Sequence, residues 1–258
     1  IYHDGWLACT TPLVPVGDSN DPAADVIGGY KWELYNVTED FSEAVNLAAQ
    51  NPGKLQELQL LFYAEAAKYN VLPLDHNRLY RMDVSIRPSL TRGRTEFTYY
   101  DGIARIPEGA APDVKNKSFR ITADVVLPKG GEQGVLVTQG GISAGYALMF
   151  EAGKPAFHYN FANIAHYSIA AKDALKPGKH VVVFDFKHDG GGLGKGGTGT
   201  LTVDGKQVAQ GRIANTMPFR ISLDETFDVG QDTGTPVSED YDVPFKFTGK
   251  IEKVVVSL

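Results

Sequence analysis

The stretch Gly134-Val135-Leu136-Val137-Thr138-Gln139 is the first of three consecutive apolar runs that decide the fold. The other two occupy residues 145–150 and 155–161, with the turn signal Ala152-Gly153-Lys154 between them. Short runs that are rich in β-branched and aromatic residues and bounded by glycine are typical of strands rather than helices. We therefore expect successive antiparallel strands joined by tight turns.

Short strand-like runs of this kind extend over most of the chain. Residues 118–125 place apolar side chains at odd positions and polar ones at even positions, which is the period of a half-buried strand. Further runs of this kind cover residues 180–187, 199–204, 218–223 and 245–258. Short strands at this spacing predict an antiparallel β-sandwich or barrel over residues 95–258.

The first part of the chain, residues 1–72, predicts a smaller unit of mixed α+β character. Residues 2–9 and 30–35 have the composition of two neighbouring strands, and residues 42–48 have that of a short helix. Asn51-Pro52 then indicates the start of a longer helix, with Asn51 as N-cap and Pro52 in the first helical position. The polar Asn70 indicates its end.

An apolar stripe marks the longer helix. Its residues recur at helical spacing and are Leu55, Leu58, Leu61, Phe62, Ala66 and Tyr69. A unit of this size is too small to bury the stripe together with Trp6 and Trp32, so we expect it to need a partner surface.

Residues 73–94 differ from the segments on either side. They contain five arginines and two prolines without apolar periodicity, which predicts an extended connector. Its arginines are either solvated or in contact with an anion. The expected organisation is therefore a small unit over 1–72, a connector over 73–94 and a β-sandwich over 95–258.

The overall composition excludes several function classes. The chain has 258 residues and a net charge of −6, so its surface as a whole does not suit nucleic acid. It shows no apolar run of membrane-spanning length and no signal peptide, and its single cysteine, Cys9, rules out an intrachain disulfide. Because the chain begins at Ile1 inside a strand-like pattern, we expect it to be part of a longer protein.

Two segments carry a resemblance to a known family. Residues 32–48 match the closing signature W-x-L-Y-[DN]-x-x-x-D-x-x-E-x-x-N-L-A of the sulfatases at Trp32, Leu34, Tyr35, Asn36, Asp40, Glu43, Asn46, Leu47 and Ala48. Residues 134–209, and further on residues 227–258, resemble the concanavalin-like, laminin-G-like jelly roll, in particular the domain at the C-terminus of some bacterial arylsulfatases. The resemblance implies a mostly β chain in which a jelly-roll sandwich follows a small sheet-plus-helix subdomain.

The same resemblance implies a non-catalytic C-terminal portion of an arylsulfatase. Such a parent enzyme hydrolyses sulfate esters with a formylglycine nucleophile and a calcium ion, and a periplasmic or secreted location is expected for it. The nucleophile motif C/S-x-P-x-R is absent here, because Cys9-Thr10-Thr11-Pro12-Leu13 places proline one position late and lacks the arginine. The expected partner is therefore a catalytic domain upstream of Ile1, and the chain alone is expected to be inactive.

Two other functions fit the predicted sandwich. It can be a stand-alone carbohydrate-binding module, with aromatic rings that stack on sugars and amides that bind hydroxyls. The candidate residues for this function are Tyr159, Asn160, Phe161, Asn163, His166 and Tyr167. Alternatively, the domain is purely structural or serves oligomerisation.

One acidic segment suggests a metal. Residues 224–242 contain seven carboxylates together with Gly230 and Gly234. Calcium takes six to eight oxygen ligands and tolerates irregular loops, so a structural Ca²⁺ can relieve the repulsion among these groups. Asp232 and Asp240 are the first candidate ligands, followed by Asp228 and Asp242. The alternative is a solvated loop whose aspartates cap turns.

Overall fold

The computed structural model describes residues 1–10, 28–72 and 89–258. The chain forms two compact units, Ile1–Arg87 and Pro88–Leu258, and each is described by itself. The boundary between them lies within the predicted connector, most of which is outside the described residues. No helix among the described residues is long and apolar enough to cross a membrane.

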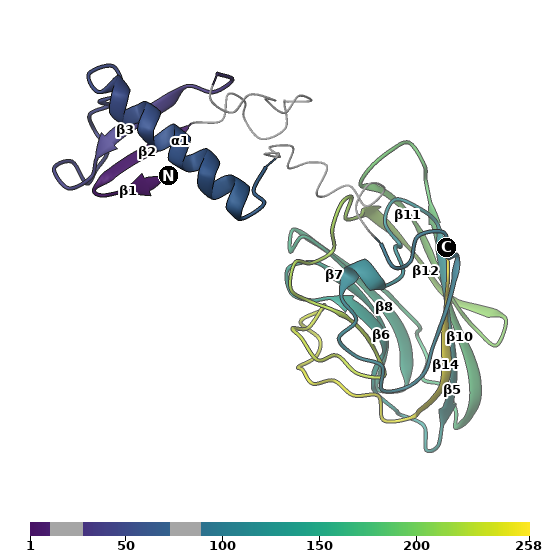
Figure 1. Ribbon diagram of the computed structural model, residues 1–258. Helices are drawn as coiled ribbons and strands as arrows, with labels where there is room; N and C mark the ends of the chain where they lie inside the picture. The colour runs from purple at the N-terminus through teal and green to yellow at the C-terminus, as the bar shows by residue number, and fades with distance from the viewer. Residues whose placement is uncertain (11–27, 73–88) are drawn as a thin grey trace. The chain divides into compact units, whose positions relative to one another are not determined.

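The first unit is a three-stranded antiparallel sheet with one helix packed on it (Figure 1). Its elements are β1 (Tyr2–His3), β2 (Trp6–Thr10), β3 (Trp32–Asn36) and α1 (Pro52–Lys68). The predicted single strand over 2–9 is therefore wrong. Asp4 and Gly5 both have positive φ, 46° and 81°, and this tight turn folds the segment into the β1–β2 hairpin.

The predicted short helix over 42–48 is also wrong. Asp40 accepts hydrogen bonds from the Val45 N–H and the Ser42 hydroxyl, and Asn46 Oδ1 accepts from the N–H groups of Leu34 and Ala48. Side chains that bind nearby backbone groups in this way compete with helix formation. The segment instead forms turns fastened to β3.

Helix α1 begins at Pro52 with Asn51 in the N-cap position, as predicted, but the capping hydrogen bond is missing. Asn51 makes no side-chain capping bond, and its amide donates instead to the Leu47 carbonyl at 3.4 Å. The leucines of the apolar stripe lie against the sheet, where Leu58 packs with Ala8 and Leu34 at the centre of the small core, whereas Tyr69, beyond the end of the helix, is largely exposed. Trp6 and Trp32 are only half-buried at its edge.

The second unit is a sandwich of two antiparallel sheets (Figure 1). The six-stranded sheet has the order β12-β11-β10-β5-β14-β4 and the five-stranded sheet has the order β13-β6-β7-β8-β9. The first contains β4 (Glu96–Tyr99), β5 (Phe119–Leu127), β10 (Gly178–His188), β11 (Lys195–Val203), β12 (Lys206–Asn215) and β14 (Lys250–Ser257). The second contains β6 (Gly134–Gly140), β7 (Gly145–Glu151), β8 (Lys154–Phe161), β9 (Ala165–Ala170) and β13 (Phe227–Val229). The predicted fold class, mostly β with a small α+β part, is confirmed.

The core lies between the two sheets. Inward side chains alternate along each strand, as Ile121, Ala123 and Val125 do on β5. At the edge of the sandwich, Gly199 lies directly opposite Ile169 of β9, and a Cβ built on Gly199 would come within 2.5 Å of Ile169 Cδ1. The glycine at this position thus allows strands from opposite sheets to approach closely.

The five-stranded sheet is buried on its outer face as well. A second apolar cluster there joins Val135, Met149 and Ala156 of the strands to Val237 and Tyr241 of the loop that follows β13. Every residue of β6 is consequently buried. A sheet covered on both faces needs apolar residues at consecutive positions, and this explains the continuous apolar runs over 134–161.

Some strand predictions need correction. Residues 218–223 form no strand, because the N–H groups of Ile221 and Ser222 donate to the Glu108 carboxylate instead of to a neighbouring strand. The predicted strand over 245–258 is regular only from Lys250. Four strands were missed, namely β4, β9, β12 and β13, and their sequences are short or polar on one side.

Candidate functional site

The β8–β9 hairpin carries most of the residues predicted to bind carbohydrate. Its tip is a tight turn in which the Ile164 N–H donates to the Phe161 carbonyl at 2.9 Å. The two central residues, Ala162 and Asn163, have φ of 52° and 54°. Positive φ at both central positions defines the type I′ turn that suits two-residue hairpins, and asparagine tolerates it well. The tip therefore has a defined backbone conformation.

The buried amide of Asn160 joins this tip to the neighbouring β6–β7 turn. Its Nδ2 donates to the carbonyls of Gly141 and Ile142 at 3.0 and 2.8 Å. Its Oδ1 accepts from the Asn163 N–H at 2.8 Å. One side chain thus satisfies three backbone groups from two hairpins and fixes their relative positions.

Around Asn160, both turns present side chains to solvent. Asn163 and His166 are exposed, with His166 Nε2 3.1 Å from Asn163 Oδ1. Ile142 and Ile164 are 53% and 78% exposed. Phe161 and Tyr167 are half-buried and pack against the core between the sheets, with part of each residue exposed. We call the surface formed by Ile142, Phe161, Asn163, Ile164, His166 and Tyr167 the hairpin rim.

Two of the predicted carbohydrate-binding residues do not reach this surface. Tyr159 belongs to the core between the sheets, where its hydroxyl accepts the Met217 N–H at 2.8 Å and burial raises its pKa. Asn160 is buried as described. Neither can offer a ring face or an amide to a ligand in solvent. Sequence analysis did not include Ile142 and Ile164, although apolar residues next to turn signals would have suggested them.

The acidic segment after β13 separates into two places. Asp228 and Asp232 are buried, and both have hydrogen-bond donors. Asp228 accepts from the N–H groups of Arg105 and Thr233 at 2.6 and 3.0 Å. Asp232 accepts from the Tyr241 hydroxyl at 2.6 Å and from the Gly234 N–H at 3.2 Å.

Burial in the first place, and to a smaller extent the nearby carboxylates of Asp228 and Glu225, together raise the pKa of Asp232 to about 6. Asp240 lies elsewhere, against His158, and Asp242 is exposed. The four aspartates predicted as calcium ligands therefore do not meet at one point. Calcium binding by these aspartates stays a prediction, and Asp228 and Asp232 are the two of them that are buried.

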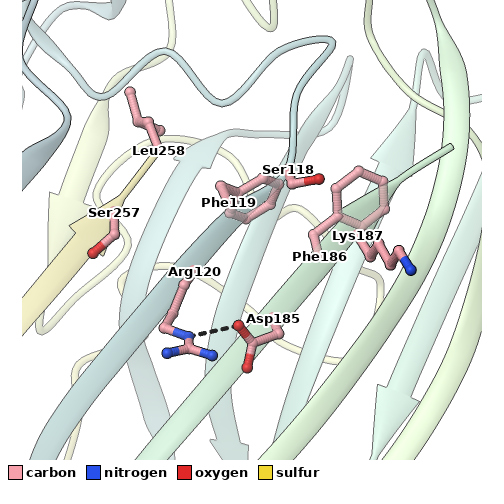
Figure 2. Close-up of a pocket in the computed structure, with 8 residues that line it drawn as sticks. All are labelled: Ser118, Phe119, Arg120, Asp185, Phe186, Lys187, Ser257 and Leu258. Atoms are coloured by element: carbon pink, nitrogen blue, oxygen red, sulfur yellow. Dashed lines mark hydrogen bonds and ion pairs between the residues drawn. The ribbon is translucent and has the colours of Figure 1, made fainter. Parts of the chain in front are cut away.

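A shallow pocket of about 430 Å³ lies on the six-stranded sheet (Figure 2). Within it, Arg120 Nε donates to Asp185 Oδ1 at 2.6 Å, and Lys187 and Ser257 lie nearby. Both partners of the ion pair are more than one-third exposed, so it contributes little stability. Sequence analysis did not single out this pocket, although the alternation over 118–125 already directs Arg120 away from the core.

Comparisons with known proteins identify no family. No protein-family model matches the chain, and a search of curated proteins found no match. The resemblance to arylsulfatases therefore stays a prediction.

Several solved structures share part of the shape. Domains LG4-5 of the mouse laminin alpha1 chain match with 12% identity and a TM-score of 0.38, over 63% of this chain and 38% of that one. The NanB sialidase of Streptococcus pneumoniae matches with 12% identity and a TM-score of 0.44, over 62% and 25%. The binding domain of botulinum neurotoxin DC, in complex with SialylT, matches with 9% identity and a TM-score of 0.34, over 62% and 36%. This chain thus spans well under half the length of each of these three proteins.

Proposed function

We propose that the sandwich unit, Pro88–Leu258, is a carbohydrate-binding module that contacts its glycan through the hairpin rim. The observation that carries this proposal is the Asn160 side chain, which joins the two turns of the rim through three backbone hydrogen bonds. Ligand sites whose geometry is set before binding lose less conformational entropy when the ligand arrives.

The chemistry of the rim suits a sugar. The amide of Asn163 and the imidazole of His166 can both donate to and accept from hydroxyl groups. The side chains of Phe161, Tyr167 and the two isoleucines offer apolar surface for the C–H faces of a pyranose ring. A few polar groups set among apolar ones are typical of small-ligand sites.

A glycan array probed with the full chain tests the proposal, followed by calorimetry on the best ligand. Asn163→Gly keeps the left-handed backbone and removes the amide, so we expect the Kd to rise about tenfold, the equivalent of 1.4 kcal/mol. His166→Ala and Tyr167→Ala should weaken binding similarly.

Two control variants show whether the loss is specific to the rim. Tyr100 is an aromatic residue of the same unit that is 61% exposed and outside the rim, so Tyr100→Ala should leave binding unchanged. Arg120→Ala alters the pocket of Figure 2. A glycan whose binding responds to Arg120→Ala and not to Asn163→Gly would move the site to the six-stranded sheet, and no binding across the array would reject the module.

The first unit supports a second candidate function, that of completing a sulfatase catalytic domain. Within the segment that resembles the sulfatase signature, Asp40 accepts hydrogen bonds from the following turn, and Asn46 accepts the N–H of Leu34 in β3. A structural role for these two residues would be consistent with this candidate function. The mass and reading frame of the intact source protein test this candidate. A C/S-x-P-x-R motif upstream of Ile1 supports it, and a complete coding frame without one rejects it.

A further inference from the structure

We propose that His158 and Asp240, with Glu151 as a positioning residue, bind one divalent transition metal ion of the zinc class. The three residues come from three segments, since Glu151 ends β7, His158 lies within β8 and Asp240 belongs to the loop after β13. One donor atom of each lies within 4.8 Å of the others. The carbohydrate site does not use this cluster, and the calcium prediction shares only Asp240 with it.

The two ring nitrogens of His158 face different carboxylates. Nε2 is 2.5 Å from Glu151 Oε1, which is a short hydrogen bond. Nδ1 is 3.7 Å from Asp240 Oδ2, beyond hydrogen-bond length. Zinc bonds to nitrogen and oxygen of about 2.0–2.2 Å place two ligands of a tetrahedral ion about 3.4 Å apart. The spacing between Nδ1 and Asp240 is therefore close to that of two zinc ligands.

The carboxylate of Glu151 contacts the second ring nitrogen of His158, the one that does not face Asp240. A histidine that binds a metal through one nitrogen commonly donates its other N–H to a carboxylate, which fixes the tautomer and orients the ring. Because a carboxylate can only accept, a neutral His158 donates Nε2–H to Glu151, and its Nδ1, 3.7 Å from Asp240 Oδ2, is then available to a metal ion. The Ser238 hydroxyl in turn donates to Asp240 Oδ2 and holds that carboxylate in place.

The charge of the cluster also suits a dication. With a neutral imidazole, the two carboxylates give a charge of −2. Among the residues that the structure describes, neither Glu151 nor Asp240 forms an ion pair with a lysine or arginine. An ion with charge +2 would neutralise both groups at a place where the imidazole is buried.

The exposed side chain of Asp240 leaves a route by which an ion from solvent can reach the cluster. The His158 side chain is only 6% exposed, whereas that of Asp240 is 61% exposed. The imidazole is thus held in the protein while the remaining coordination positions face water. Imidazole nitrogen is a ligand for zinc, nickel and copper, whereas calcium and magnesium take oxygen ligands, so the cluster should prefer the first group.

Binding would have a structural consequence. Asp240 lies in the loop whose Val237 and Tyr241 cover the outer face of the five-stranded sheet. An ion shared by His158 and Asp240 would fasten this loop to strand β8. Because the ion binds the folded state only, it should raise the melting temperature in proportion to the logarithm of its concentration.

The test uses the full chain after chelator treatment, with calorimetric titration of ZnCl₂ and the absorption spectrum of the Co²⁺ form. We expect one Zn²⁺ per chain, and a Co²⁺ spectrum showing nitrogen and oxygen ligands. Asp240→Asn keeps the shape and removes the charge, so it should weaken zinc binding at least about tenfold. Glu151→Gln should cost about tenfold as well and change the Co²⁺ spectrum, because it alters the orientation of the ring.

Matched controls exclude adventitious binding. His180 is another histidine beside an aspartate, with Nδ1 2.7 Å from Asp204, so His180→Gln should leave zinc affinity unchanged. Cys9→Ser removes the single thiol and should also have no effect. Because Asp240 is exposed, Asp240→Asn should fold normally even where a His158 variant does not. Zinc binding that Asp240→Asn leaves intact, that His180→Gln abolishes, or that is not detected at millimolar zinc would overturn the proposal.

Discussion

The rings of Phe157 and Phe184 stack face to face across the sandwich, with centroids 3.5 Å apart and planes 7° from parallel. Phe157 belongs to β8 of one sheet and Phe184 to β10 of the other, and both are fully buried. This contact lies within the largest apolar cluster that the described residues form. It therefore connects the sheet that carries the hairpin rim to the sheet that carries the pocket.

We predict that Phe184→Ala lowers the free energy of unfolding of the sandwich unit by about 3–5 kcal/mol, because it removes a ring and leaves a cavity. Denaturant unfolding followed by tyrosine fluorescence and circular dichroism measures this. Val183→Ala, on the opposite side of the same strand, should change stability by about 0.5 kcal/mol or less. Equal effects of the two substitutions would contradict the assignment of the core.

A second prediction concerns pH. The pKa of Asp232 is raised to about 6 from 3.8, so the folded state favours the protonated acid. This contribution to stability is complete below the unfolded pKa and is lost as pH rises through about 6. A tenfold change in the dissociation constant of an acid corresponds to about 1.4 kcal/mol, and partial solvation of the carboxyl reduces the effect, so the expected loss is about 1–3 kcal/mol.

Asp232→Asn isolates this effect. Without calcium, the variant should be more stable than the parent at pH 7.5, and the difference should disappear near pH 4. Melting temperatures measured across that range in the presence of chelator provide the comparison. Asp173→Asn, at an exposed carboxylate of the same unit, serves as control and should leave the pH profile unaltered. A difference in melting temperature between variant and parent that grows as the pH falls would contradict the predicted direction of the effect.

A third prediction concerns calcium. If Ca²⁺ binds at Asp228 and Asp232, it removes the repulsion between these buried carboxylates and stabilises the folded chain. Millimolar calcium should then raise the melting temperature of the chelator-treated protein, and Asp232→Asn should abolish the rise. Asp173→Asn should retain it. No rise in the parent, or a rise that survives Asp232→Asn, would rule out this site.

A fourth prediction concerns catalysis. Because Cys9 is followed by Thr10 and Thr11, with no arginine at the required position, the chain lacks the sequence from which sulfatases make their nucleophile. The purified chain should give no turnover of an activated aryl sulfate above background, with or without calcium. Turnover that Cys9→Ser leaves unchanged, in protein free of other sulfatases, would show that the nucleophile lies elsewhere in this chain.

By itself, the sequence determined the class of the fold and many of its strands. The alternation over 118–125 and the glycine-bounded runs over 134–161 were enough to predict four of the strands, because strand periodicity and turn chemistry are local properties. Local patterns were less informative where side chains bond to the backbone. Asp40 and Asn46 turned an expected helix into a loop in this way, and Glu108 took the N–H groups that a strand at 218–223 would need.

Only the tertiary structure decided which polar residues meet. Asp228 and Asp240 look equivalent in one acidic segment, yet one is buried against the N–H of Arg105 and the other lies beside His158. Tyr159 and Tyr167 are likewise paired in a single hairpin, yet the first is buried in the core and the second, although it packs against the core, is partly exposed in the rim. Such contacts join residues up to 123 positions apart, and their partners depend on how the two sheets pack, which no local pattern encodes.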